Sequence, residues 1–189
     1  MRNQFLTFLL CLLTSTFIFA QDKTVKPWSD KNFEGLALRS IGPAFMSGRI
    51  ADIAIHPEDE NTWYIAVASG GVWKTINAGV TWNPIFDKEG SFATGCVTID
   101  PHNPHVVWVG TGENVGGRHL SFGDGVYRSD DGGTTWKNMG LKNSNHISKI
   151  VIHPENSDVI WVASQGPLWT KGGERGLYKS IDGGKTWKQ

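Results

Sequence analysis

Apolar residues recur with a period of two in three short segments of the chain, and a proline ends each segment. The segments are Ile53–Pro57, Val97–Pro101 and Ile150–Pro154. A period of two is typical of a β-strand, and proline has no N–H with which to continue a ladder. A second apolar segment begins six residues after each proline, at Trp63, Val107 and Ile160. The pattern predicts pairs of neighbouring strands, and no stretch after residue 20 shows sustained helical periodicity.

A twelve-residue segment follows each predicted strand pair and occurs three times without a gap. The copies are Gly71–Trp82, Gly125–Trp136 and Gly176–Trp187. Each predicts a strand, a tight turn and the start of another strand, because Asp-Gly-Gly favours hairpins and the closing Trp brings roughly 150–250 Å² of surface to bury. The repeat of about 44 to 54 residues, with four strands per unit, predicts propeller blades rather than two-helix repeats.

The pattern Ser/Thr-x-Asp-x-Gly-x-Thr-Trp in these segments resembles the Asp-box of BNR-repeat proteins. That group includes sialidases, xyloglucanase-type glycoside hydrolases and the propeller of sortilin-type (VPS10) receptors. The matching residues, which we interpret as structural, are Asn77, Trp82, Ser129, Asp131, Gly133, Trp136, Ser180, Asp182, Gly184 and Trp187. The first copy departs from the pattern with Asn77 for Asp and Thr75 for Ser. We therefore expect an all-β fold, a β-propeller fragment of about three four-stranded blades with Asp-box hairpins.

The order of the segments predicts the domain organisation. Residues 1–20 contain Arg2 followed by an uncharged, mainly apolar run, which is typical of a secretory signal peptide. Residues 21–43 either supply a strand that closes a propeller or form an ordinary lead-in. The predicted blades are 44–90, 91–143 and 144–189, and we expect downstream blades, because three blades leave outer faces exposed and promote self-association.

Composition limits the classes of partner, metal and cofactor that we expect. The 18 Lys and Arg balance 18 Asp and Glu, so neither nucleic acid nor an anionic membrane is expected as a partner, and no transmembrane segment is expected. Cys96 is the only cysteine after residue 20, so no intrachain disulfide is expected. His56 and His153 precede prolines as turn residues, and Asp130–Gly132 lacks the spacing of a calcium loop. No metal or cofactor is expected.

The predicted loops between the second and third strands lengthen along the chain, and insertions on one face of a repeat array often mark a binding face. In the first blade the loop between these strands has two residues, Ser69 and Gly70. In the second and third blades the corresponding loops are residues 113–124 and 166–175. The candidate binding residues are Glu113, Arg118, His119, Asp124, Trp169, Lys171, Glu174 and Arg175. Either they clamp a peptide terminus or a sugar, or their charges pair across adjacent blades in solvated loops.

Two functions remain open. The first is a secreted recognition or scaffolding module, extracellular or periplasmic, that binds a peptide, protein or glycan. The alternative is a glycoside hydrolase of the xyloglucanase or sialidase type. In xyloglucanase-type enzymes, an Asp that lies two residues before a Gly pair supplies a catalytic carboxylate. The corresponding Gly pair in this chain is Gly70-Gly71, and the residue two positions before it is Ala68. Because an inverting glycosidase needs two carboxylates, Ala68 favours the module, and no set of Arg and Tyr typical of a sialidase is evident.

Overall fold

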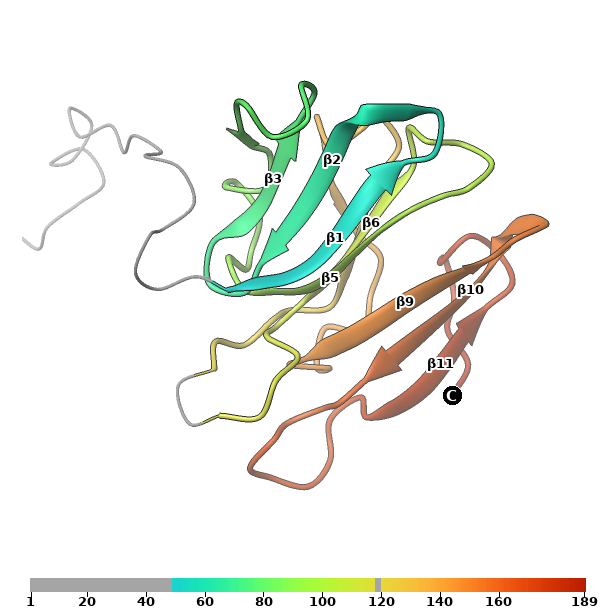
Figure 1. The fold of residues 1–189 in the computed structure, drawn as a ribbon. Helices are drawn as coiled ribbons and strands as arrows, with labels where there is room; N and C mark the ends of the chain where they lie inside the picture. The colour runs from blue at the N-terminus through green and yellow to red at the C-terminus, as the bar shows by residue number, and fades with distance from the viewer. Residues whose placement is uncertain (1–48, 118–119) are drawn as a thin grey trace, which may run out of the picture. The chain divides into compact units, whose positions relative to one another are not determined.

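The computed structural model describes residues 49–117 and 120–189, all within one unit of the chain (Figure 1). The predicted leader 1–20, the lead-in 21–43 and the candidate residues Arg118 and His119 lie outside the described residues.

The described residues contain eleven strands and no helix, as the sequence pattern predicts. In chain order the strands are β1 (Ile50–His56), β2 (Asp59–Val67), β3 (Gly71–Thr75), β4 (Asn83–Pro84), β5 (Thr94–Ile99), β6 (Val107–Thr111), β7 (Val126–Ser129), β8 (Lys137–Asn138), β9 (Ile147–His153), β10 (Asn156–Ser164) and β11 (Gly176–Ser180).

Consecutive strands pair antiparallel in three sheets, which we call blades 1, 2 and 3. Blade 1 has the order β1-β2-β3-β4 and blade 2 the order β5-β6-β7-β8. Blade 3 contains β9, β10 and β11, and a single bridge between Lys179 and Lys188 stands where the other blades have a fourth strand. The strand pairs are therefore local in sequence, as expected of a meander.

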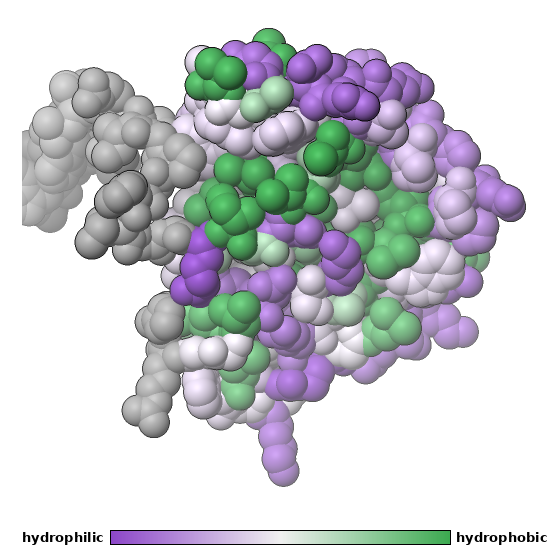
Figure 2. Space-filling view, in the orientation of Figure 1, coloured by the Kyte–Doolittle hydropathy of each residue, from purple (hydrophilic) through white to green (hydrophobic). Residues whose placement is uncertain are grey.

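The first strands of the three blades lie next to one another, with β5 in contact with both β1 and β9 (Figure 1). Most of β5 is consequently buried, whereas Ile53 on β1 and Val151 on β9 remain 53% and 50% exposed. These three strands line an open groove of about 440 Å³, and Figure 2 shows apolar side chains gathered in this region.

Hydrophobic side chains fill both junctions between blades. Tyr64 and Val72 of blade 1 pack against Val109 and Tyr127 of blade 2. On the other side of blade 2, Trp108 packs in one cluster with residues of blade 3, which include Ile150, Ile160 and Val162. Burial of this apolar area is the main force that holds the blades together. The fold is that of β-propeller blades, and the predicted fold class is confirmed.

Side chains within each twelve-residue segment fix its turn. In blade 2, the Ser129 hydroxyl donates to Asp131 Oδ1 at 2.7 Å and accepts the Gly133 N–H at 2.8 Å. The N–H and hydroxyl of Thr135 donate to the same carboxylate at 2.8 and 2.6 Å. These bonds, chiefly those from Thr135, lower the pKa of Asp131 to about 2.

The other two segments repeat these contacts. Ser180, Asp182 and Thr186 make the same set in blade 3, and the bonds from Thr186 lower the pKa of Asp182 to about 2. In blade 1, Asn77 Oδ1 accepts the Thr81 N–H at 2.9 Å in place of a carboxylate. The turn geometry therefore tolerates a neutral amide at this position.

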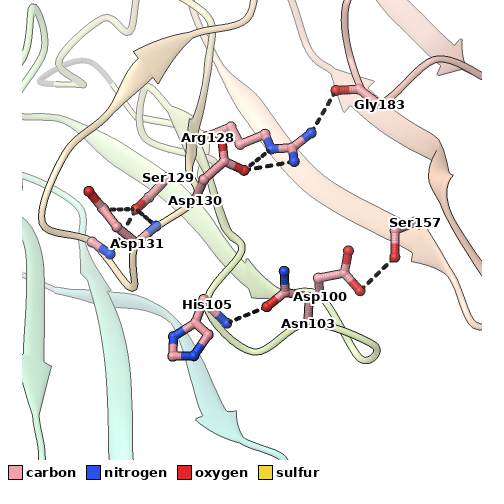
Figure 3. Close-up of polar contacts among 10 residues, drawn as sticks. Asp100, Asn103, His105, Arg128, Ser129, Asp130, Asp131, Ser157 and Gly183 are labelled. Carbon is pink, nitrogen blue, oxygen red and sulfur yellow. Dashed lines mark hydrogen bonds and ion pairs between the residues drawn. The ribbon is translucent and has the colours of Figure 1, made fainter.

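The tryptophans at the ends of the second and third segments reach back to the preceding blade. The indole N–H of Trp136 donates to Ile85 O at 2.7 Å, and that of Trp187 donates to Met139 O at 2.8 Å. A further polar contact between blades joins the Ser157 hydroxyl to Asp100 Oδ1 at 2.9 Å (Figure 3). Each junction thus combines apolar packing with directional hydrogen bonds.

Candidate functional site

Loops from all three blades gather at one end of the sheets, which we call the loop face. It comprises residues 68–70, 85–93, 112–117, 120–125, 139–146 and 165–175. Backbone hydrogen bonds join the loops of neighbouring blades, from Gly71 N to Phe92 O at 2.7 Å and from Gly123 N to Asn145 O at 2.7 Å. The longer loops of blades 2 and 3 project at the lower left of Figure 1. The candidate binding residues that the structure describes all lie on this face.

Glu113 sits below the surface of the loop face and is fully buried. Its Oε1 accepts the Ser69 hydroxyl at 2.6 Å, and its Oε2 forms an ion pair with the half-exposed Arg49 guanidinium. Its carbonyl oxygen contacts His146 Nδ1 at 2.8 Å. Glu113 therefore links the loops of all three blades. Both of its carboxylate oxygens are engaged, an arrangement that fixes the loops and leaves no free base.

His146, which sequence reasoning did not select, lies fully buried beside Glu113. Burial lowers the pKa of His146, so the ring is neutral and Nδ1 donates its hydrogen to Glu113 O. His146 Nε2 and Ser144 Oγ are buried without a hydrogen-bond partner among the described residues. A lone histidine just before a strand gives no signal in a sequence, because the burial comes from Phe122 and the blade 2 loop, which are distant along the chain.

Asp124 and Glu89 form a pair of acidic groups at the junction of blades 1 and 2. Asp124 Oδ2 accepts the Tyr127 hydroxyl at 2.6 Å, and its Oδ1 accepts the Thr111 hydroxyl at 3.3 Å. Burial, followed by the nearby charge of Asp124, raises the pKa of Glu89. Burial and the bond to Asp124 raise the pKa of Tyr127. Glu89 is missing from the sequence-based candidates, since only the fold brings its loop next to Asp124.

The blade 3 loop carries the most exposed candidates. Trp169 is 67% exposed, and Lys171 and Arg175 are also exposed. Glu174 is half-buried and fastens the loop, because its Oε2 accepts the Asn143 N–H at 2.7 Å and its own N–H donates to Asn143 O at 3.2 Å. The Arg175 guanidinium donates to Pro167 O across the base of the loop. An exposed indole and two cations thus stand on a loop with a fixed base.

Ala68 is buried at the edge of the loop face. Its N–H donates to Arg49 O at 2.8 Å, and its carbonyl accepts the Thr94 N–H at 3.2 Å. A methyl group occupies this position, so the carboxylate that the xyloglucanase resemblance implies is missing there.

Within residues 49–117 and 120–189, no group of three His, Cys, Asp or Glu side chains could hold a metal ion. Over the same residues, no helix has the length and apolar character needed to span a bilayer.

Two curated relatives are fungal xyloglucanases. The chain is 24% identical over 154 residues to an oligoxyloglucan-reducing end-specific xyloglucanase of Emericella nidulans, and 26% identical over 156 residues to a xyloglucanase of Hypocrea jecorina. Each match covers 75% of this chain but only 18% of the relative. The chain thus spans about a fifth of the length of the curated relatives it matches. No family model matches.

Solved structures of a GH74 enzyme and of YCF48 share the fold of this chain. A GH74 enzyme of Niastella koreensis is 23% identical with a TM-score of 0.54, over 72% of this chain and 20% of the enzyme. A structure of YCF48 bound to D1 peptide is 15% identical with a TM-score of 0.51, over 75% of this chain and 40% of YCF48. Both are β-propeller proteins, so the chain has the fold of a propeller segment.

Proposed function

We propose that the chain is a secreted recognition or scaffolding module of propeller type, which binds a peptide, protein or glycan through its loop face. The exposed indole of Trp169, on the same loop as Lys171 and Arg175, is the observation that carries this proposal. The sortilin-like and Asp-box character, the signal peptide and the extracellular location belong to the same proposal.

The chemistry of these side chains fits such ligands. An indole offers a large flat surface on which a sugar ring or an apolar side chain can stack. Lysine and arginine donate to carbonyl, carboxylate and hydroxyl oxygens, and arginine can do so in a bidentate manner. The hydrogen bonds of Glu174 to Asn143 limit the motion of the loop, which lowers the entropy lost when a ligand binds.

The names of the relatives support a surface that binds a peptide or a glycan. One propeller with this fold was solved bound to a peptide, and the xyloglucanases are named for a glycan. Peptide, protein and glycan all remain ligand classes of the proposal, because the chain covers a minor part of each of these proteins.

A binding experiment tests the proposal. The purified chain is titrated by calorimetry with xyloglucan oligosaccharides and screened against a library of short peptides. Replacing Trp169 by Ala is expected to weaken binding of any hit at least tenfold, while the control Val80→Ala, at an 80% exposed position outside the loop face, leaves it unchanged. Equal loss in both variants, or no ligand in either class, contradicts the proposal.

The second candidate is a glycoside hydrolase, favoured by the acidic pair of Glu89 and Asp124 and by the xyloglucanase relatives. A carboxyl group with a raised pKa can act as a general acid, and the second carboxylate can act as a base. Against it stand Ala68 and the engagement of Asp124 by Tyr127 and Thr111. Release of reducing sugar from β-glucan oligosaccharides, or of sialic acid from a sialoside, that disappears in Glu89→Gln would favour this candidate.

A further inference from the structure

An open pocket of about 440 Å³ lies between the outer strands of blade 1 and the turn of blade 2. Blade 1 contributes Lys74 of β3, Pro84 of β4 and side chains of the segment 85–89. Blade 2 contributes the turn 132–134 and Trp136. Both blades have all four strands, so each wall of the pocket is formed in full. None of the candidate binding residues that the structure describes on the loop face lines this pocket.

Contacts below the surface hold the walls of the pocket in place. Trp136 donates its indole N–H to Ile85 O at 2.7 Å, and its ring meets the buried Phe86 ring edge-on at 5.2 Å between centroids. The Glu89 N–H donates to Phe86 O at 3.3 Å, which closes a turn in the segment 85–89. The pocket is therefore already formed when a ligand arrives, and little entropy is lost in ordering it.

The junction between blades 2 and 3 shows which residues the repeat itself requires. Trp187 donates its indole N–H to Met139 O at 2.8 Å, the same bond that Trp136 makes to Ile85 O. Ile85 and Met139 are therefore counterparts, and the residues that follow them can be compared position by position.

The acidic residues of the pocket have no counterparts at the second junction. Two positions after Ile85 stands the exposed Asp87, where the second junction has the buried Leu141. Four positions after Ile85 stands Glu89, where the second junction has Asn143. Because the second junction forms without these carboxylates, the packing of one blade on the next does not require them.

The formal charges that line the pocket cancel. Asp87 and Glu89 supply two carboxyl groups, and Lys74 and Lys88 supply two amines. An ion of either sign would meet like charge as well as opposite charge in this pocket. An uncharged ligand with hydroxyl groups can instead donate to the carboxylates and accept hydrogen bonds from the amines.

Apolar surface lines the same pocket, from Pro84, Ile85 and Trp136. A saccharide ring carries C–H groups on its faces and hydroxyl groups around its edge, so it uses an aromatic or apolar surface together with polar partners. The volume lies in the range of about 300–1,000 Å³ that is typical of sites for small ligands. These features together fit a neutral saccharide.

We propose that this pocket is a second binding site, which takes a short stretch of an uncharged saccharide. The saccharide packs on Trp136 and Pro84, its hydroxyl groups donate to Asp87 and Glu89, and Lys88 donates to its oxygen atoms. The site goes beyond the binding proposed for the loop face, because it can be occupied whether or not Trp169 holds a ligand.

NMR titration of the purified chain, labelled with ¹⁵N, tests the proposal. The probes are four neutral disaccharides (cellobiose, maltose, lactose and mannobiose) and two charged compounds, glucuronate and glycylglycine. The indole N–H signal of Trp136, assigned with Trp136→Phe, is expected to shift in a saturable manner with at least one disaccharide and with neither charged compound. A shift of Trp169 without Trp136 would support the loop face and overturn the second site. No saturable shift of Trp136, or a shift with the charged compounds alone, would also overturn it.

Two variants that copy the second junction locate the binding. Asp87→Leu, after Leu141, is expected to weaken binding at least tenfold, and its control Glu155→Leu removes the same charge at an exposed residue of blade 3 and binds as wild type. Thr134→Lys, after Lys185, places a long cation in the pocket and is also expected to weaken binding at least tenfold, whereas the reverse change Lys185→Thr has no effect. Both changed positions are exposed, so the rest of the spectrum is expected to match the wild type. Undiminished binding in either variant would overturn the proposal.

Discussion

Gly184→Ala measures how much of the stability depends on the close approach of a turn to the preceding blade. Gly184 has a φ of 84°, so any L-residue there costs about 1–2 kcal/mol of conformational energy. The added Cβ would also overlap the Trp108 ring, which is 1% exposed and closed in by the core between blades 2 and 3. Overpacking of this kind costs about 1–3 kcal/mol. The expected loss in the free energy of unfolding is the sum, about 2–5 kcal/mol.

Gly172→Ala separates the conformational cost of a side chain at positive φ from the cost of overpacking. Gly172 has a φ of 93° and open space around the added Cβ, so this variant loses only the conformational part. The two variants should differ by about 1–3 kcal/mol, or roughly 2–12 °C in Tm. Urea unfolding followed by tryptophan fluorescence, at one low protein concentration, gives both values. Stabilities equal within about 0.5 kcal/mol would refute the view that Trp108 leaves no room for a side chain at Gly184.

Three further changes test other contacts. Glu113→Ala removes the buried carboxylate that accepts the Ser69 hydroxyl and pairs with the half-exposed Arg49 guanidinium, and it is expected to destabilise the fold by about 2–3 kcal/mol in the same unfolding assay, whereas a loss under about 1 kcal/mol would mean that the buried carboxylate is dispensable. Asp182 has its pKa lowered to about 2, so its contribution to stability is full above its usual pKa of 3.8 and falls as the pH drops toward 2; Asp182→Asn should flatten the stability profile over that range, and an unchanged profile would contradict this. Burial raises the pKa of Cys96 to about 12, so a thiol reagent at pH 8 should label it only in denaturant, and rapid labelling of the native chain would show that the site is open.

The repeated pattern predicted the fold because its determinants are local. A strand ended by Pro57 and a turn marked by Gly132 and Gly133 each lie within a dozen residues, and hairpin pairing follows from them. The third blade departs from four named strands, since only Lys188 bridges to Lys179 there.

The site was less accessible to sequence reasoning, because its properties arise between blades. Glu113 is predicted either to bind a ligand or to pair its charge across adjacent blades, and the sequence does not show its burial, because its contacts to Ser69 and Arg49 bridge 44 and 64 residues. Burial, followed by the charge of Asp124 from the next blade, raises the pKa of Glu89, and both causes arise only in the fold. Trp169, by contrast, lies exposed on a long loop insertion, a feature that the repeat alignment itself reveals.

The contacts between blades run from a later turn to an earlier blade, and this order bears on how such a chain folds while it is being synthesised. Trp136 and Trp187 find their acceptors 51 and 48 residues earlier in the chain, and Gly132 and Gly183 are held by donors at least 55 residues earlier. A chain that emerges from its N-terminus always presents the receiving surface before the turn that docks on it. Each new repeat can be captured as soon as its hairpin closes, so growth of the structure follows the order of synthesis and no blade waits for a partner that has yet to appear.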